Sequence, residues 1–156
     1  MHGSAKLNQF RPAHPDDIGH ITHLVTSLYV KLGSAYQIPM DTKSVVEAVI
    51  HTIRHGVCLV GDHACAGGFI DSFVWNRSVK VGNVLFWNYS RPSGVRILEA
   101  LAVEFQNRGA SHLGVASHYP DNLAARFYSR IGLQPCEQQH IVAIETIHRP
   151  FSKHQT

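Results

Sequence analysis

The sequence is poor in cysteine: Cys58, Cys65 and Cys136 are its three thiols, and no two of them form a C-x-x-C pair. This spacing argues against a zinc knuckle and against a disulfide framework, so we expect reduced thiols in the core. Apolar runs of about 20 residues, the length of a membrane helix, are also missing, so we expect no membrane partner. The first ten residues lack the apolar region of a secretion signal, and the cytoplasm is the expected compartment.

Charge is also sparse: charged residues make up 16% of the 156 residues and leave a formal net charge of +3. This mild excess suits a negatively charged ligand, but the basic residues form no run, which disfavours nucleic-acid binding. The 12 histidines include two pairs at helical spacing, His20 with His23 and His51 with His55. Two ligands without a matching carboxylate do not make a metal site, so we expect no metal.

The apolar periodicity predicts one mixed α/β domain over residues 1–156, with flexible tails at 1–8 and 149–156. The predicted order is β-α-α-β-β-β-α-β-α-β-β. Helices are expected at 18–32, 42–55 and 121–131. A further helix is expected to begin after the turn at Arg91 and to end near 108–109. Strands are expected at 9–13, 57–60, 64–75, 79–89 and 112–117, with the last ones formed by Leu133 and 141–147. Residues 76–78 are expected to break the third and fourth strands apart, and the strand at 112–117 is expected to run parallel to its neighbour.

A tight turn links the strand ending near Tyr89 to the third helix. Backbone N–H groups and the positive end of the helix dipole meet there, which makes the turn a candidate phosphate site. The same glycine and proline would also fit an ordinary loop. The turn consists of Arg91, Pro92, Ser93, Gly94, Val95 and Arg96.

Two sequence blocks in this element order resemble the GNAT superfamily of acyl-CoA-dependent N-acyltransferases, over roughly residues 10–147. The first is the turn, which resembles the family's Arg/Gln-x-x-Gly-x-Gly/Ala, except that Arg96 replaces the final small residue. The second resembles Asn-x-x-Ala-x-x-Phe-Tyr-x-x-x-Gly-Phe; Ala124, Phe127, Tyr128 and Gly132 are in register, with Asp121 at the Asn position and Asn122 one step late.

The resemblance implies a twisted, mostly antiparallel sheet of six to seven strands with about four helices, splayed between the fourth and fifth strands. Acetyl-CoA would be the co-substrate, with its pantetheine arm in the splay. The residues implied to bind it are Phe86, Trp87 and Asn88, the turn from Arg91 to Arg96, and Asp121 and Asn122. A backbone N–H near Trp87 or Asn88 would bind the oxyanion, and Tyr128 resembles the family's general acid.

The base that would deprotonate the amine is open. Many family members use a glutamate on the fourth strand, but residues 79–89 contain no carboxylate. His118 and Asp71 are the candidates, and a water chain would also serve. Tyr36, in the connector between the first two helices, is a candidate for contacting the substrate.

The leading hypothesis is therefore acetyl transfer from acetyl-CoA to a primary amine, whether a small molecule, a peptide N-terminus or a lysine. A second hypothesis is a module that binds acyl-CoA without turnover, which Arg96 and the missing carboxylate favour. A third is association with nucleic acid, suggested by Trp87, Tyr89 and Arg91 lying close together. A homodimer is left open.

Overall fold

The structure is a computed structural model that describes residues 9–36, 38–89, 93–116 and 122–136. The chain divides into two compact units, one of residues 1–31 with 40–116 and one of residues 32–39 with 117–156, and each is described by itself. The tails predicted at 1–8 and 149–156, and the last strand predicted at 141–147, lie outside the described residues. A single domain over residues 1–156 stays a prediction.

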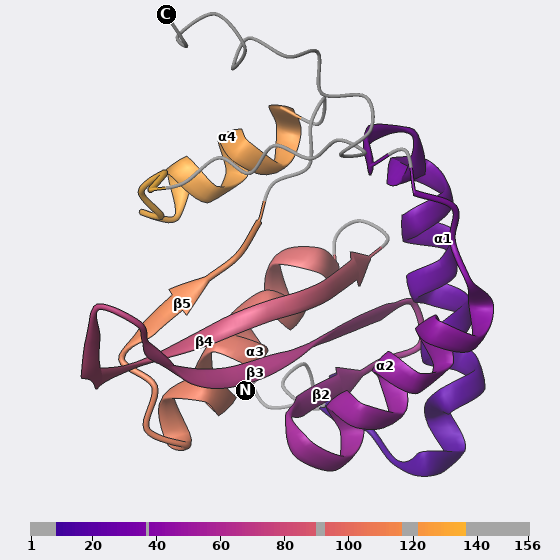
Figure 1. Ribbon diagram of the computed structural model, residues 1–156, viewed down its shortest axis with the longest axis horizontal. Helices are drawn as coiled ribbons and strands as arrows, with labels where there is room; N and C mark the ends of the chain where they lie inside the picture. Colours follow the sequence, from indigo (N-terminus) through magenta and orange to yellow (C-terminus); the bar gives the residue numbers. More distant parts are fainter. Residues whose placement is uncertain (1–8, 37, 90–92, 117–121, 137–156) are drawn as a thin grey trace, which may run out of the picture. The chain divides into compact units, whose positions relative to one another are not determined.

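The first unit is built on a mixed sheet whose strand order follows the sequence (Figure 1). Neighbouring strands are antiparallel except for the last pair, which is parallel as predicted. Within the described residues the sheet has five strands, fewer than the six to seven expected. They are β1 (Arg11–Pro12), β2 (Val57–Val60), β3 (Ala64–Phe73), β4 (Asn76–Tyr89) and β5 (His112–Gly114).

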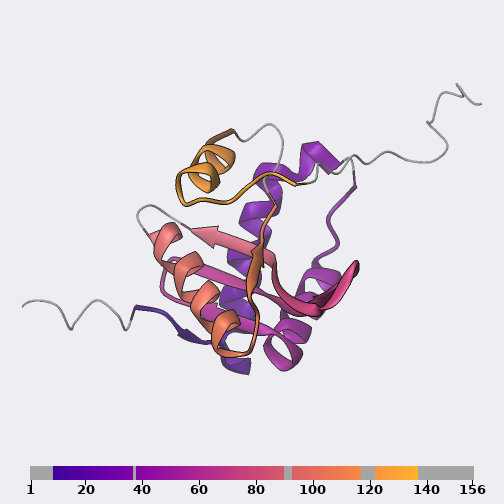
Figure 2. The ribbon, with the colours of Figure 1, turned by 90° about the vertical axis from the view of Figure 1, so that its left-hand side faces the viewer.

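Helices cover both faces of this sheet, as Figures 1 and 2 show. One face packs on α1 (Ile18–Tyr36) and α2 (Thr42–His55), through a core of Ile21, Val49, Cys58, Val60, Cys65 and Phe86. The other face packs on α3 (Ser93–Asn107), whose buried side chains are Ile97, Leu98, Leu101 and Phe105. Phe105 lies directly over Gly82 of β4, where a Cβ would come within 2.3 Å of its ring. The second unit contains α4 (Asn122–Arg130).

The helix boundaries follow from capping. Asp41 accepts the Ser44 N–H at 2.9 Å and begins α2, and Gly56 ends it. Gly109 and Gly132, which follow α3 and α4, have φ values of 98° and 91°, conformations that glycine adopts without strain. The sequence predicted each of these boundaries to within two residues.

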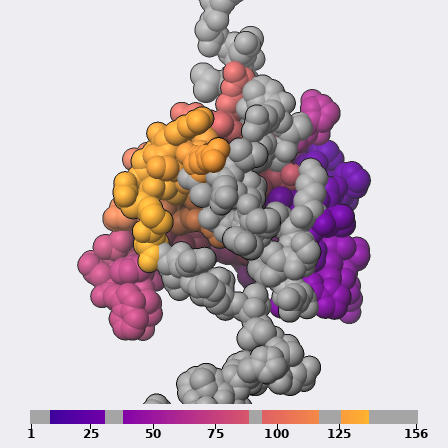
Figure 3. All heavy atoms as spheres, turned by 90° about the horizontal axis from the view of Figure 1, so that it is seen from above, coloured from indigo at the N-terminus to yellow at the C-terminus, as the bar shows by residue number. Residues whose placement is uncertain are grey.

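Three sequence predictions need correction. The first helix continues past Gly33 to Tyr36, because one glycine weakens a helix without ending it. The turn between β3 and β4 is at Val74 and Trp75 rather than at 76–78, and Trp75 is 85% exposed. The end of the β3–β4 hairpin is part of the pink region that projects from the surface in Figure 3. Leu133 is not in a strand, because its N–H closes the end of α4 on the Tyr128 carbonyl at 3.0 Å.

The entry into α1 depends on Asp17, in a short 3-10 helix, η2 (Pro15–Asp17). Arg11 donates two hydrogen bonds to the Asp17 carboxylate, at 2.7 and 2.8 Å, and the His14 N–H donates a third at 2.7 Å. Only 14% of the Asp17 side chain is exposed. The bonds from Arg11 are the main cause that lowers the pKa of Asp17 to about 2.

We therefore expect Asp17→Asn to lower the free energy of unfolding at pH 7 by about 1–2 kcal/mol. A carboxyl whose pKa is lowered by folding stabilises the fold above its unfolded pKa of about 3.9, and this contribution is lost as the pH falls toward 2. The difference between the two proteins should thus shrink between pH 4 and pH 2 in urea titrations. Asp16→Asn, at a side chain that is 93% exposed, is the matched control. An equal loss in both variants would contradict the role of Asp17.

Candidate active site

The sheet opens between β4 and β5. These strands pair only from Val81 with His112 to Asn83 with Gly114. β4 continues to Tyr89, whereas the chain leaves β5 after Gly114 and turns away from β4 (Figure 1). The predicted splay of the fourth and fifth strands is therefore confirmed, with its apex at the pair of Asn83 and Gly114.

A β-bulge lies next to this apex. Gly67 pairs with Phe86 and Gly68 pairs with Val84, so Leu85 is an extra residue in β4 and is 56% exposed. A bulge bends the strand that carries it and increases the local twist, which turns β4 away from β5 just beyond their last pair. Gly68 allows this close approach, because a Cβ at this position would come within 1.9 Å of the Asn83 carbonyl oxygen.

The backbone of β4 faces the opening at Trp87. The Gly61 N–H donates to the Ala64 carbonyl at 2.9 Å, so the Ala64 backbone faces β2. Because backbone groups alternate along a strand, Cys65 faces β4, and its partner Asn88 faces β3. Trp87 consequently turns its backbone toward the side from which β5 departs. Of the two residues near which the sequence predicts an oxyanion donor, Trp87 is the one whose backbone lies on the open side of β4.

The side chains of this stretch of β4 have structural contacts. Phe86 belongs to the core under α1 and α2. Trp87 is 8% exposed, and its indole Nε1 donates to the Gly94 carbonyl at 2.9 Å, which fixes the first turn of α3 to the strand. Asn88 is buried, and its side-chain amide donates to the Leu24 carbonyl in α1. A ligand in the splay would therefore meet the backbone of these residues more than their side chains.

The N-terminus of α3 follows directly after the splayed end of β4. A helix of 15 residues places a partial positive charge and orphan N–H groups at its first turn. Gly94 is buried there, while Val95 and Arg96 are exposed. Arg91 and Pro92 lie outside the described residues, and so does the side chain of Ser93.

The structure describes only some of the remaining predicted site residues. Tyr128 in α4 is 8% exposed, and its ring lies 5.9 Å from that of Phe127 between centroids. Asp71 is exposed on β3, opposite Val81 of β4. His118 and Asp121 lie outside the described residues; Asn122 begins α4 and Tyr36 ends α1, with neither side chain described. Their roles stay predictions.

Sequence reasoning missed Asn83 and the bulge at Leu85. A signal was present, because Gly67 and Gly68 are consecutive glycines inside a predicted strand, and glycine there often marks a bulge or a close backbone approach. Asn83 carried no signal of its own, since only its pairing with Gly114 places it at the apex.

The buried thiols are not nucleophiles. Burial raises the pKa of Cys58 and of Cys65 to about 12, so both remain protonated at neutral pH. In the described ranges no three histidine, cysteine or acidic side chains come together to hold a metal ion. No described helix is long and apolar enough to cross a bilayer.

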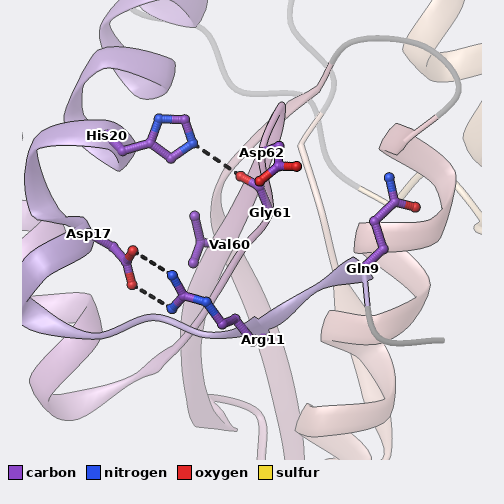
Figure 4. A pocket seen from close by; sticks show the side chains of 7 residues that line it. All are labelled: Gln9, Arg11, Asp17, His20, Val60, Gly61 and Asp62. Atoms are coloured by element: carbon purple, nitrogen blue, oxygen red, sulfur yellow. Dashed lines mark hydrogen bonds and ion pairs between the residues drawn. The ribbon is translucent and has the colours of Figure 1, made fainter. Parts of the chain in front are cut away.

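A small cavity of about 310 Å³ lies at the other edge of the sheet (Figure 4). The Arg11–Asp17 ion pair forms one wall, and His20 Nε2 lies 3.1 Å from the Gly61 carbonyl oxygen. The pair already satisfies the Arg11 guanidinium and the Asp17 carboxylate, so these groups serve the fold. The lining residues are Gln9, Arg11, Asp17, His20, Val60, Gly61 and Asp62.

Several solved structures with the same architecture are described as acetyltransferases, and one as a transcriptional regulator of Bacillus halodurans. A predicted acetyltransferase of Clostridium acetobutylicum, solved with acetyl-CoA, superposes with a TM-score of 0.70 at 16% identity, covering 90% of this chain and 98% of that one. An aminoglycoside N-acetyltransferase in complex with CoA gives 0.68 at 11% identity, with 86% and 92% covered. A ribosomal-protein-alanine N-acetyltransferase of Brucella melitensis gives 0.61 at 13% identity, with 86% and 96% covered.

These likenesses identify the class of fold: the chain has the fold of the GNAT superfamily, as the two sequence blocks predicted. No protein-family model and no curated protein sequence matches the chain. At these identities the similarity establishes the architecture alone.

The bulge gives a direct test of the splay. We expect Gly68→Ala to destabilise the protein by about 2–3 kcal/mol, because the new Cβ would collide with the backbone of β4. Gly19→Ala is the matched control: nothing lies within 4 Å of a Cβ there, and alanine should stabilise α1 by about 0.5–1 kcal/mol. Urea unfolding measures both changes. A neutral Gly68→Ala would contradict the close contact of β3 and β4 at the bulge.

Proposed function

We propose that this protein is an N-acetyltransferase that moves an acetyl group from acetyl-CoA to a primary amine by direct attack in a ternary complex. The parting of β4 from β5, with the N-terminus of α3 at its open end, is the observation that carries the proposal. It offers an extended slot for the pantetheine arm and a positive helix end for the phosphates. Similar structures hold acetyl-CoA and CoA.

The phosphates would bind at the turn from Arg91 to Arg96. The indole of Trp87 donates to the Gly94 carbonyl and holds Gly94 in place. The N–H groups of the first turn of a helix have no partner within the helix, so those of α3 would face a ligand. Arg96 stands where the family has a small residue, and its exposed guanidinium would meet a phosphate oxygen directly. The long Arg96 side chain would also exclude a ligand whose phosphate must lie directly against the backbone at this position.

The chemistry requires a donor for the oxyanion and a proton for the leaving sulfur. The Trp87 N–H, on the open side of β4, would stabilise the oxyanion of the tetrahedral intermediate. Tyr128 would donate its hydroxyl proton to the CoA thiolate. The proton lost by the amine would pass to His118, to Asp71 or to water.

A non-catalytic protein that binds acyl-CoA is the second candidate. Arg96 and the absence of a carboxylate between Asn76 and Tyr89 favour it. The acceptors named for similar structures, an aminoglycoside and a ribosomal-protein alanine, differ from each other and fix no acceptor for this chain. Ligand binding and turnover must therefore be measured separately.

Binding is tested by thermal unfolding with and without acetyl-CoA. A ligand at about 100 times its dissociation constant adds about 2.7 kcal/mol to the free energy of unfolding. We expect a rise in the melting temperature with acetyl-CoA and none with ATP at the same concentration, because ATP carries phosphates but no pantetheine arm. Equal shifts would indicate a simple phosphate site, and no shift with acetyl-CoA would refute both candidate functions.

Turnover is tested by Tyr128→Phe. We expect the rate of thiol release in the presence of an amine to fall by about tenfold or more, with acetyl-CoA stabilisation retained, because only the proton donor is removed. Tyr29→Phe, in α1, is the matched control. An unchanged rate in Tyr128→Phe would remove the assigned role of Tyr128. Stabilisation by acetyl-CoA without thiol release for any amine would favour the binding module.

A further inference from the structure

The hairpin of β3 and β4 extends past the other strands of the sheet. β2 pairs with β3 no further than Gly68, and β5 pairs with β4 no further than Val81. From Gly68 to Phe73, the last residue of β3, the strand rises about 16 Å at roughly 3.3 Å per residue. Within the described residues the end of the hairpin therefore projects without a flanking strand (Figure 1).

Three consecutive apolar residues form the apolar tip of this hairpin: Phe73, Val74 and Trp75, all of them exposed. Phe73 pairs with Asn76, so Val74 and Trp75 are the two residues of the turn. Two-residue hairpin turns favour glycine, asparagine and aspartate, because their backbone often has positive φ. Valine and tryptophan suit neither such a turn nor exposure to water. Apolar side chains grouped in this way mark a contact surface.

The chain behind the apolar tip is held in place. The Asn76 carboxamide oxygen accepts from the Ser78 N–H at 3.2 Å and from the Ser78 hydroxyl at 2.6 Å. Across the hairpin, Lys80 Nζ donates to the Ser72 hydroxyl oxygen at 2.7 Å. The apolar tip is thus presented on an ordered support, so that contact with a partner requires little further ordering of the chain.

Two cations lie behind the apolar tip, because Arg77 and Lys80 are both exposed. Between residues 71 and 80, Asp71 is the single carboxylate. It is opposite Val81, one pair further from the tip than Lys80. A partner that covers the apolar tip would therefore meet positive charge at its margin, which favours an anionic partner.

The shape of the apolar tip distinguishes between anionic partners. Single-stranded nucleic acid binds along a basic groove with stacked aromatic side chains, whereas this tip projects and places the aliphatic Val74 between two aromatic residues. The cavity at the β1 edge, lined mostly by polar and charged side chains, does not match the apolar tip of a second copy. An anionic lipid surface accepts apolar side chains below its headgroups and cations beside them, and tryptophan is enriched at this depth.

We propose that the apolar tip inserts into the headgroup region of an anionic phospholipid bilayer, with Arg77 and Lys80 at the anionic headgroups. Each basic residue near such a surface strengthens binding by about fivefold. The sequence predicted no membrane partner because it lacks a spanning run, and a peripheral contact of this kind needs no such run.

This contact is independent of the proposed acetyl transfer. β4 leads from the hairpin to Tyr89 and the N-terminus of α3, so the apolar tip and the candidate phosphate site lie at opposite ends of the strand. A bilayer at the tip would leave the acetyl-CoA end of β4 in water. Lipid binding and stabilisation by acetyl-CoA are therefore separate measurements.

Vesicle sedimentation tests the proposal with the full chain. One set of vesicles contains phosphatidylcholine alone, and the other contains phosphatidylcholine with phosphatidylserine. At low salt we expect binding to the anionic vesicles that is about fivefold or more tighter than to the neutral ones. Trp75 emission should shift to the blue on binding, whereas Trp87 is already buried. No binding to the anionic vesicles, or equal binding to both, would overturn the proposal.

A matched pair of variants tests the apolar tip. Val74→Ser combined with Trp75→Ser should weaken binding to the anionic vesicles by about tenfold or more, because burial of a large apolar side chain contributes at least this factor. Val30→Ser in α1 is the control, since Val30 is 73% exposed against 67% for Val74 and lies outside the tip. Unchanged binding in the tip variant would overturn the role of these residues.

The cations are tested one at a time. Arg77→Gln and Lys80→Gln should each weaken binding to the anionic vesicles by about fivefold at low salt, with a smaller effect at high salt. Lys43→Gln, at an exposed lysine of α2, removes the same charge elsewhere and is the control. An equal loss in Lys43→Gln would show that net charge alone drives binding, against the placement of Arg77 and Lys80 at the headgroups.

Two further measurements separate other partners from the lipid. Binding of a single-stranded oligonucleotide that is tighter than vesicle binding, and is lost in the tip variant, would assign the apolar tip to nucleic acid. A dimer in analytical ultracentrifugation that becomes a monomer in the tip variant would assign it to a second copy. Either result would overturn the lipid proposal. Urea unfolding of each variant shows whether a loss of binding comes from the side chain or from the fold.

Discussion

The contact between Gly68 and the backbone of β4 is the constraint on which the site depends. It lets β4 carry the additional residue Leu85, and this bulge bends β4 away from β5 immediately after their last pair. A regular β4 would continue the ladder with β5 and close the opening. The opening between β4 and β5 thus depends on a glycine in β3, a strand that does not border it.

One short stretch of β4 serves the core through its side chains and the candidate site through its backbone. The Phe86 side chain packs in the core, that of Trp87 donates a hydrogen bond to α3, and that of Asn88 donates one to α1. Alternation leaves the Trp87 backbone directed to the opening. Since the Trp87 indole also holds Gly94, the same residue sets the distance between the strand edge and the first turn of α3. Substitutions here would change stability and ligand geometry together.

Much of the fold could be read from the sequence, because apolar spacing and caps such as Asp41, Gly109 and Gly132 are local signals. The extension of α1 past Gly33 was missed because a glycine is only a weak terminator. At the site, the sequence indicated the splay and the helix end through the resemblance of two short blocks. It did not indicate Asn83, because pairing across β4 and β5 is a long-range property that no local pattern reports. The choice between Trp87 and Asn88 likewise required the register of three strands.

The short first strand has a consequence for self-assembly. β1 consists of Arg11 and Pro12 alone, and a proline has no N–H to donate. Among the described residues, this edge of the sheet offers a neighbouring molecule almost no ladder on which to add a strand. Copies of this chain are therefore protected here from the edge-to-edge pairing that leads exposed sheets to aggregate.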